Sequence, residues 1–383
     1  MKAKQPTNEM VAALSQKPTE DGITRLSGRP LLIYGAGNYG RIIHWLLTQN
    51  GIPSDSIRGF LDAAATEGKM LLGLPVRRPE DPAVAEQLQK EAEVVISIYC
   101  SLEEQNRIAD HLRRLGYRNV RSCYETAISF HTANDPATRI AGTGYLQANV
   151  ENIVTGYEYW DDDLSRETYL NHFLGYARCD INSFLFETGH KQYFPPLPLR
   201  GKGHGRFIDC GAFDGDTVRD LHADSGKVES LALFEPCEQN FDRLSCFVRK
   251  KEHHLAGQVY LYPCGVWNKT SQLRFNSEAA AASSVTDSGD GFIQCVALDD
   301  ALHGFGPTCI KMDVEGAEPM ALRGAEMMIR KHKPDLAISV YHALSHFWEL
   351  PTLVRQWVPE YRLYLRTYAA AGYETVMYAV TGD

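Results

Sequence analysis

The sequence predicts an α/β protein with two Rossmann-like domains, a C-terminal one with seven strands and a smaller N-terminal one, joined by a helical connector. From Arg206 onward, apolar runs of strand length alternate regularly with amphipathic helical segments, which indicates a parallel sheet. Glycine-rich turns follow an apolar run twice, at 35–40 and 211–215, and each turn leads into a helix. We therefore expect an N-terminal tail at 1–28, a first domain at 29–125, the connector at 126–205 and the second domain at 206–383.

The composition narrows the class of protein. The chain has 383 residues, 23% of them charged and 44% hydrophobic, which is typical of globular proteins. Its formal net charge of −9 argues against nucleic-acid binding, which needs clustered Lys and Arg. Nine cysteines without a C-x-x-C pair favour reduced thiols. Met1–Gly28 is polar without a signal-peptide core, and no run approaches the roughly 18 apolar residues of a membrane span. We expect a soluble cytoplasmic protein without a membrane span, and homo-oligomers are compatible with it.

The first domain begins with a buried strand at Leu31–Tyr34 and a helix after it. Gly35, Gly37 and Gly40 form G-x-G-x-x-G between the two, the context in which this motif binds a dinucleotide. The second strand, Ile57–Leu61, ends at Asp62, where an acid can bind a ribose. A third strand is expected at 94–98 and a further helix at 108–115. Two interpretations stay open: a nucleotide site, or glycines that serve only helix–strand packing.

A partial resemblance bears on that choice. Gly59-Phe60-Leu61-Asp62, followed by Gly73-Leu74-Pro75-Val76, resembles the N-terminal domain of sugar O-acyltransferases that bind a nucleotide sugar. The resemblance implies a nucleotide or nucleotide sugar as a partner of residues 29–125.

The connector is rich in aromatic residues at mixed helical spacing. Asp161-Asp162-Asp163 can start a helix, because carboxylates are favourable near its positive end. Pro195, Pro196 and Pro198 then interrupt regular structure. We expect helices packed on the second domain, with a cap over an active site as the alternative role.

The second domain alternates strands and helices to the end of the chain. We expect strands at 207–210, 231–234, 259–263, 309–312, 336–340, 363–366 and 375–380, helices at about 216–223, 237–249 and 319–331, and a hairpin of 272–275 with 292–296.

These residues resemble the FkbM family of S-adenosylmethionine (SAM)-dependent methyltransferases. The matching segments are Asp209-Cys210-Gly211-Ala212 with Gly215-Asp216, Phe234-Glu235-Pro236, Leu298-Asp299-Asp300, Lys311 to Glu318, and Arg323-Gly324-Ala325. The resemblance implies a Rossmann-like methyltransferase fold and O-methylation of a hydroxyl, often on a sugar or natural product. Many members carry Asn where this chain has Phe213, so the resemblance assigns no ligand contact to that side chain.

SAM binding is also indicated by the residue types. A turn without side chains at Gly211 and Gly215 lets the backbone approach the amino-acid end of SAM. Asp209 is placed to hold the ammonium, directly or through water, and Glu235 can accept from both ribose hydroxyls. The other expected cofactor-binding residues are Ala212, Asp216 and, near the adenine, Gly265. The structural alternatives are that Gly211 only turns the chain and that Glu235 caps the next helix.

Candidates for catalysis follow the later strands. They are Asp313, Glu315, His342 and Lys311, with His342 chemically attractive as a general base because its charge responds near neutral pH. An equally weighted alternative is that His342 only hydrogen-bonds Glu315 or caps a helix. Asp313, Glu315, Glu318 and His342 also form a candidate ligand set for a divalent metal, although their spacing is not diagnostic.

The sequence therefore predicts a SAM-dependent O-methyltransferase acting on a hydroxyl of a sugar, glycoconjugate or natural product. Two other classes stay open: an NAD(P)-dependent oxidoreductase that uses the N-terminal glycine motif, and a catalytically silent nucleotide-sugar-binding protein. The sequence leaves the acceptor atom, the metal dependence and the oligomeric state undetermined.

Overall fold

The computed structural model describes residues 11–12, 14, 26, 28–49, 51–98, 100–122, 125, 144–178, 181–186, 189–250, 254–275 and 291–382. Most of the predicted N-terminal tail and residues 126–143 of the predicted connector lie outside these residues. The chain divides into two compact units. The first comprises 1–150, 170–185 and 369–371, and the second comprises 151–169, 186–368 and 372–383.

A six-stranded sheet in the order β3-β4-β2-β1-β5-β6 forms the centre of the first unit. Its strands are parallel except β3, which runs antiparallel to β4. Apolar side chains from alternate positions of β1 pack into one cluster on each face, as expected of a strand buried on both sides. The elements are β1 (Leu31–Tyr34), α3 (Asn38–Gln49), η1 (Ser54–Ser56), β2 (Ile57–Leu61), β3 (Met70–Leu71), β4 (Leu74–Arg77), α4 (Glu86–Glu91), β5 (Glu93–Ile96), α5 (Leu102–Arg114), β6 (Asn119–Arg121) and α7 (Gly144–Ala148).

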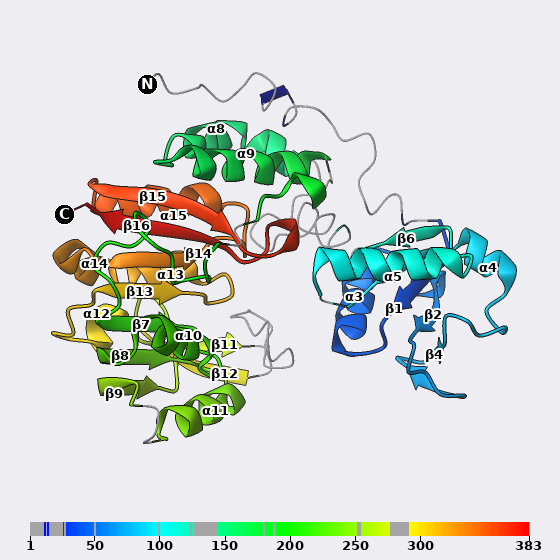
Figure 1. Cartoon of the computed structure of the whole chain (residues 1–383), viewed down its shortest axis with the longest axis horizontal. Helices are drawn as coiled ribbons and strands as arrows, with labels where there is room; N and C mark the ends of the chain where they lie inside the picture. The colour runs from blue at the N-terminus through cyan, green and yellow to red at the C-terminus, as the bar shows by residue number, and fades with distance from the viewer. Residues whose placement is uncertain are drawn as a thin grey trace. The chain divides into compact units, whose positions relative to one another are not determined.

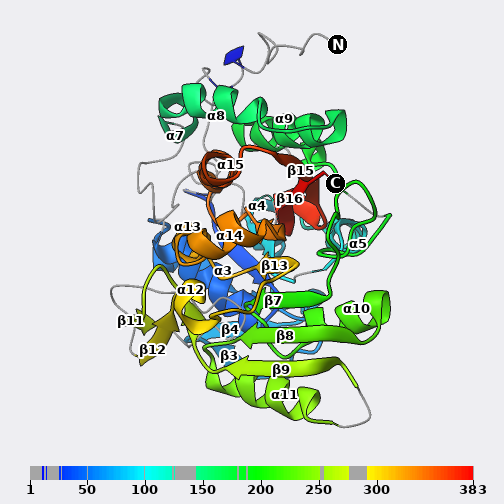
Figure 2. The same ribbon diagram turned by 90° about the vertical axis from the view of Figure 1, so that its left-hand side faces the viewer.

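The second unit contains the predicted seven-stranded sheet, in the order β15-β16-β14-β13-β7-β8-β9, which Figure 1 shows from β15 at the top to β9 at the bottom. β16 runs antiparallel to both of its neighbours, β14 and β15, and all other neighbouring strands of this sheet are parallel. The strands are β7 (Arg206–Cys210), β8 (Val228–Phe234), β9 (Ala256–Tyr262), β13 (Cys309–Met312), β14 (Asp335–Ser339), β15 (Tyr361–Thr367) and β16 (Thr375–Thr381). A separate small sheet has the order β10-β12-β11, and Figure 2 shows β11 and β12 beside the large sheet. Its strands are β10 (Gly265–Val266), β11 (Ser271–Phe275) and β12 (Gly291–Val296).

Helices connect the strands of the second unit: α10 (Asp216–Ser225), α11 (Glu238–Val248), α12 (Leu298–Ala301), α13 (Glu318–Arg323), α14 (Glu326–His332) and α15 (His346–Trp357). The single helix predicted at 319–331 is wrong, because the chain forms α13 and α14 instead. At the break, a Cβ on Gly324 would lie 2.0 Å from the Trp267 carbonyl oxygen. The close approach of another backbone segment therefore accounts for glycine at the break.

Part of the predicted connector packs on the edge strand β15. Helices α8 (Val150–Tyr157) and α9 (Asp163–Arg178) are joined by Trp160, which pairs with Leu363 of β15 and is buried. The Asp162 carboxylate accepts from the Ser165 amide at 2.8 Å and so caps α9. It also pairs with Arg366 at 2.6 Å. Burial of aromatic residues and this ion pair thus attach residues 151–169 to the second unit.

Candidate active site

A cavity of about 390 Å³ lies at the carboxyl ends of the central strands of the second unit. Residues that directly follow four strands line it: Gly211 after β7, Glu235 after β8, Asp313 after β13 and Tyr341 close after β14. This is the edge at which open α/β sheets bind their ligands. The full lining is Gln192, Tyr193, Gly211, Phe213, Asp216, Thr217, Phe234, Glu235, Pro236, Asn240, Gly265, Val266, Ile293, Cys295, Lys311, Asp313, Val314, Glu315, Ala317, Tyr341 and Glu374.

The turn after β7 brings the backbone to the edge of this cavity. Gly211 has φ +91°, and a Cβ there would lie 1.9 Å from the Asp313 carbonyl oxygen. Gly215 has φ +90° and packs against Phe247, without lining the cavity. The amides of Gly211 and Ala212 donate to the Phe234 carbonyl, at 3.1 and 2.9 Å. The turn is therefore fixed to β8 by its own backbone, and of its glycines Gly211 faces the cavity.

Phe213 holds the position at which the resembling family often has Asn. Its φ is +45°, a conformation that Asn adopts more readily than a bulky side chain. Its amide donates to Glu235 Oε2 at 2.9 Å. The backbone contact of this position is thus independent of the side chain, and Phe213 lines the cavity.

Glu235 is held by the backbone on both of its oxygens. Oε2 accepts from the Phe213 amide, and Oε1 accepts from the Cys237 amide at 2.8 Å. Burial raises the pKa of this carboxyl group, while the two amides oppose that shift. Glu235 accepts from the N-cap residue of α11, which agrees with the structural alternative. It also lines the cavity, as the ligand interpretation requires.

Asp209 and Lys311 form a buried ion pair behind the cavity. They are register partners on β7 and β13, and Lys311 Nζ lies 2.9 Å from Asp209 Oδ1. Lys311 Nζ also donates to the Gly211 carbonyl at 2.6 Å and lies 5.3 Å from the Tyr193 ring centroid. Burial raises the pKa of Asp209 to about 6 against the opposing effect of Lys311. Burial lowers the pKa of Lys311, but Asp209 and Asp313 outweigh it and raise that pKa.

Lys311 lines the cavity and Asp209 does not. Direct contact of Asp209 with a ligand ammonium is therefore not supported by its placement. Asp209 instead holds Lys311 against the carbonyl of the glycine turn.

Asp313 is surrounded by hydrogen-bond donors. Tyr193 Oη donates to Asp313 Oδ2 at 2.9 Å and lies 3.1 Å from Ser339 Oγ. Tyr341 Oη lies 3.5 Å from Asp313 Oδ1. This carboxylate therefore has a fixed orientation at the cavity wall.

Two further carboxylates line the same end of the cavity. Burial raises the pKa of Glu315 to about 7, and Glu315 has a backbone φ of +53°. Glu374 accepts from Gln192 Nε2 at 2.8 Å, and its Oε1 lies 3.5 Å from Tyr341 Oη. Burial, and then Asp313, raise the pKa of Glu374. We call Asp313, Glu315 and Glu374 the acidic end of the cavity.

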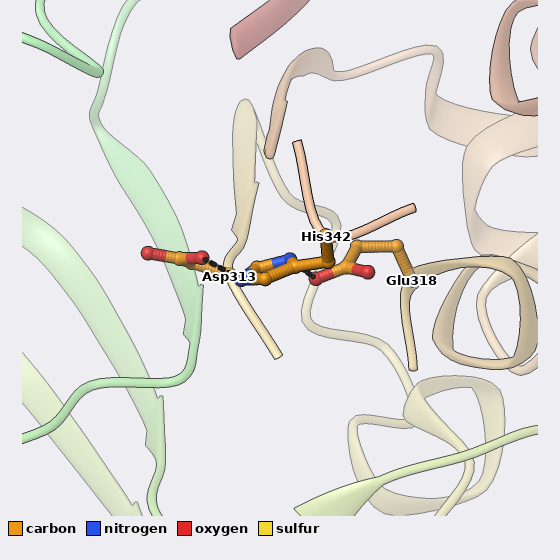
Figure 3. Close-up of side chains that lie close together, drawn as sticks. All are labelled: Asp313, Glu318 and His342. Atoms are coloured by element: carbon orange, nitrogen blue, oxygen red, sulfur yellow. Dashed lines mark ion pairs between the residues drawn. The ribbon is translucent and has the colours of Figure 1, made fainter. Parts of the chain in front are cut away.

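His342 lies between carboxylates just outside the cavity lining, as Figure 3 shows for Asp313 and Glu318. Its Nδ1 is 2.9 Å from Glu318 Oε1, and its Nε2 is 3.6 Å from both Asp313 Oδ1 and Glu315 Oε2. Burial lowers the pKa of His342, but Glu318 outweighs it and the pKa rises to about 10. Glu318 is buried, which raises its pKa, yet His342 lowers that pKa to about 2. Within the described residues and without a further ligand, His342 is a cation at neutral pH and a poor general base.

Among the lining residues that the sequence did not indicate as site residues, four contribute polar groups close to Asp313: Gln192, Tyr193, Tyr341 and Glu374. Tyr193 and Gln192 precede the first strand of the domain, and Glu374 precedes its last. Tyr341 directly follows the predicted strand at 336–340, and this position could have indicated it as a site residue. No sequence signal could have indicated the others.

The predicted N-terminal site has its own internal contacts. A Cβ on Gly40 would lie 2.2 Å from the Gly35 carbonyl oxygen, so Gly40 serves helix–strand packing. Gly35 has φ +110° and Ser97 packs against it, whereas the space around Gly37 is open. The Asp62 carboxylate accepts from the amides of Ala36, at 2.9 Å, and Ala64, at 2.8 Å. Nucleotide binding by Gly35, Gly37, Gly40 and Asp62 stays a prediction.

The chain is similar to known proteins in sequence and in fold. Residues 209–374 match the family model described as the methyltransferase FkbM domain. The fold is similar to the crystal structure of a methyltransferase FkbM from Methylobacillus flagellatus, with a TM-score of 0.73, 21% sequence identity, and coverage of 97% of this chain and 98% of the other. No curated protein sequence matches the chain. No helix in the described parts of the chain is long and apolar enough to cross a membrane.

The predicted resemblance and the predicted fold class are thereby confirmed: residues 209–374 match the methyltransferase FkbM domain, and the fold is similar to that of a methyltransferase FkbM. This domain supports methyl transfer as the activity.

Proposed function

We propose that the FkbM domain transfers a methyl group from SAM to a hydroxyl of a sugar, glycoconjugate or natural product. The observation that carries this proposal is one continuous cavity with two different ends. Glu235, held by two backbone amides, lies in one wall, and the acidic end lies in another. A methyl donor and an acceptor require such neighbouring sites.

The residues of the first end suit SAM. Glu235 presents a fixed carboxylate to a ribose diol, which is the role of the acid after the second strand in nucleotide-binding folds. Pro236, Val266 and Ile293 supply apolar surface for an adenine. Gly211 lets the turn after β7 pack against the backbone of Asp313, where a Cβ would clash, and its own backbone lines the cavity near the expected amino-acid end. The volume lies within the range of small-molecule sites.

The chain's own residues would align the acceptor. Bound SAM supplies a methyl group whose C–S bond breaks as the new O–C bond forms, with the electron pair remaining on sulfur. In-line displacement depends mainly on alignment of the acceptor oxygen. The carboxylates of the acidic end would accept hydrogen bonds from the hydroxyls of the acceptor, and one of them would take the proton of the reacting hydroxyl.

A polyhydroxylated acceptor fits the acidic end because Asp313, Glu315 and Glu374 are hydrogen-bond acceptors and Gln192 supplies an amide. A sugar offers several hydroxyl donors at once. An acceptor with a carboxylate or phosphate at this end would meet like charge. The proposed substrate class is therefore a neutral or cationic hydroxyl compound.

The test is calorimetry with SAM, NAD and UDP-sugars, followed by methyl transfer to a panel of sugar and non-sugar hydroxyl compounds. We expect SAM to bind and the sugars to be methylated. Asp313→Asn should lower turnover at least about 100-fold, the scale of loss of a group that positions or deprotonates the acceptor, with SAM affinity changed little. Asp62→Asn is the matched control, since it removes a carboxylate that also follows a strand, but in the other unit.

The proposal fails if SAM gives no heat while NAD binds at micromolar affinity. Methylation confined to carboxyl groups would reject the substrate class. The boundaries 29–125, 126–205 and 206–383 are part of this proposal, with methyl transfer assigned to the last segment.

A further inference from the structure

Two carboxylate oxygens face one ring nitrogen of His342 at the acidic end of the cavity. His342 Nε2 lies 3.6 Å from Asp313 Oδ1 and 3.6 Å from Glu315 Oε2. Both separations exceed a hydrogen-bond distance. Both ring nitrogens of His342 are buried and have no hydrogen-bond partner in the described part of the chain, and the side chain is 10% exposed. Nε2 thus lies at ion-pair distance from two carboxylate oxygens without a hydrogen bond to either.

The other nitrogen of the same ring faces the carboxylate of Glu318. Nδ1 lies 2.9 Å from Glu318 Oε1, and that oxygen also accepts from the Val314 amide at 2.9 Å. Glu318 is fully buried, so it can change orientation little. Histidines that ligate metals commonly have one nitrogen held by a carboxylate in this way, which turns the other nitrogen toward the metal.

The distances from His342 Nε2 to Asp313 Oδ1 and to Glu315 Oε2 suit ligands of a shared cation. Divalent metals bind imidazole nitrogen and carboxylate oxygen at about 2.0–2.2 Å, so two ligands of one ion lie roughly 3–3.6 Å apart. One imidazole with two carboxylates suits manganese, magnesium or zinc. Asp313, Glu318 and His342 offer ligand atoms that all lie within 4.8 Å of one another. Glu318 faces Nδ1 of the ring, whereas Asp313 faces Nε2, and Figure 3 shows the two carboxylates on either side of the imidazole.

We propose that Asp313 Oδ1, Glu315 Oε2 and His342 Nε2 bind one divalent cation at the acidic end, with Glu318 as the positioning residue of the imidazole. The cation replaces the proton on Nε2, which is released to solvent on binding. Asp313 and Glu315 line the cavity, so the cation would be within reach of a bound acceptor. Its catalytic role rests on the proposed function, whereas its binding does not.

That role is to activate the acceptor hydroxyl. A divalent cation lowers the pKa of a hydroxyl that it binds. The O–H bond then breaks, the proton passes to a carboxylate, and the oxygen keeps the electron pair for attack on the methyl carbon. Glu374 is placed to take the proton, because it lines the same cavity and is connected to Asp313 through Tyr341.

The test uses the full chain after treatment with a chelator, titrated with Mn²⁺ and followed by electron paramagnetic resonance. We expect one Mn²⁺ per chain and, by pulsed measurement, a nitrogen coupling from the imidazole. Glu315→Gln should weaken Mn²⁺ binding at least about tenfold, because a ligand is lost. Glu374→Gln is the matched control: it removes one carboxylate from the same end and should leave Mn²⁺ affinity within about twofold.

His342→Gln should abolish the nitrogen coupling. If this buried substitution prevents folding, the Mn²⁺ affinities of Glu315→Gln and Glu374→Gln are compared to decide whether the cation binds at the proposed ligands. The absence of stoichiometric Mn²⁺ binding, or equal weakening by both glutamate substitutions, would overturn the site. SAM binding is measured separately. If SAM binds and Mn²⁺ does not, only the cation site is rejected. If Mn²⁺ binds and SAM does not, only the proposed function is rejected.

Discussion

Each unit has a glycine turn after the first strand of its large sheet, and the two turns are held by the same kind of hydrogen bond. In the first unit, Asp62 follows β2 and accepts from the amide of Ala36 at 2.9 Å. In the second, Glu235 follows β8 and accepts from the amide of Phe213 at 2.9 Å. In both, the acid after the neighbouring strand fixes the turn. This device by itself therefore does not distinguish a ligand site from a packed turn.

The difference lies on the other side of each turn. In the first unit, Ser97 follows β5, and its hydroxyl donates to the carbonyls of Tyr34 and Gly35, at 2.9 Å each. In the second, Asp313 follows β13 and lines the cavity. A small hydroxyl completes the backbone hydrogen bonding, whereas a carboxylate brings charge to the edge of the sheet. The residue after the strand that pairs with the other side of β1 or β7 thus indicates chemistry better than the glycines do.

Gly211→Ala should have the largest effect of any single substitution in either turn. The added Cβ would overlap the Asp313 carbonyl, and φ +91° is unfavourable for alanine. We expect a loss of unfolding free energy of at least about 3 kcal/mol, together with loss of SAM binding. Urea unfolding and calorimetry measure the two effects. A variant with wild-type stability would contradict the described geometry of this turn.

Glu235→Gln should affect ligand binding more than folding. An amide oxygen can still accept one backbone hydrogen bond, but the amide NH₂ faces the other donor and the carboxylate is lost. SAM affinity should fall about 10- to 100-fold, which corresponds to about 1.4–2.8 kcal/mol. Calorimetry at constant salt measures this change. Unchanged affinity would mean that Glu235 only caps α11.

The positions of the strands in the large sheet, and the residues that directly follow them, could be predicted from the sequence. The expected strand at 309–312 has the observed bounds of β13, because its apolar residues stand between clear turn signals. Gly211, Glu235 and Asp313 could be placed at one edge because parallel strands end there together. The pattern of apolar residues thus predicts where the strands end, and the strand ends predict this part of the site.

The remaining residues of the site depend on tertiary contacts. Tyr193 donates to Asp313 across 120 residues of sequence. Glu374 lies just before β16, which runs opposite to the other strands, so its start, and not its end, reaches the cavity. The register that pairs Asp209 with Lys311 is likewise absent from the local pattern. These contacts decide which acids face a ligand and which are neutralised within the protein.

Asp62→Ala tests whether the acid of the first unit is structural. It removes two hydrogen bonds to backbone amides, so the first unit should lose about 1–2 kcal/mol of unfolding free energy. SAM affinity should be unchanged, in contrast to Glu235→Gln. Thermal unfolding and SAM calorimetry on the same sample provide the comparison. A fall in SAM affinity equal to that of Glu235→Gln would show that the two acids are not independent.

Gly37→Ala should have the smallest effect on stability and separates the two interpretations of the first turn. No atom lies within 4 Å of a Cβ built at Gly37, and its φ is not in the positive region, so alanine fits without strain. Stability should stay equal or rise by about 0.4–1 kcal/mol, since alanine lowers the entropy of the unfolded chain. A phosphate that approaches the backbone there would meet the new methyl group. Calorimetry with NAD and UDP-sugars on both proteins is therefore decisive. A ligand that binds the wild type and is lost in Gly37→Ala establishes a nucleotide site, and absence of binding to the wild type establishes a packed turn.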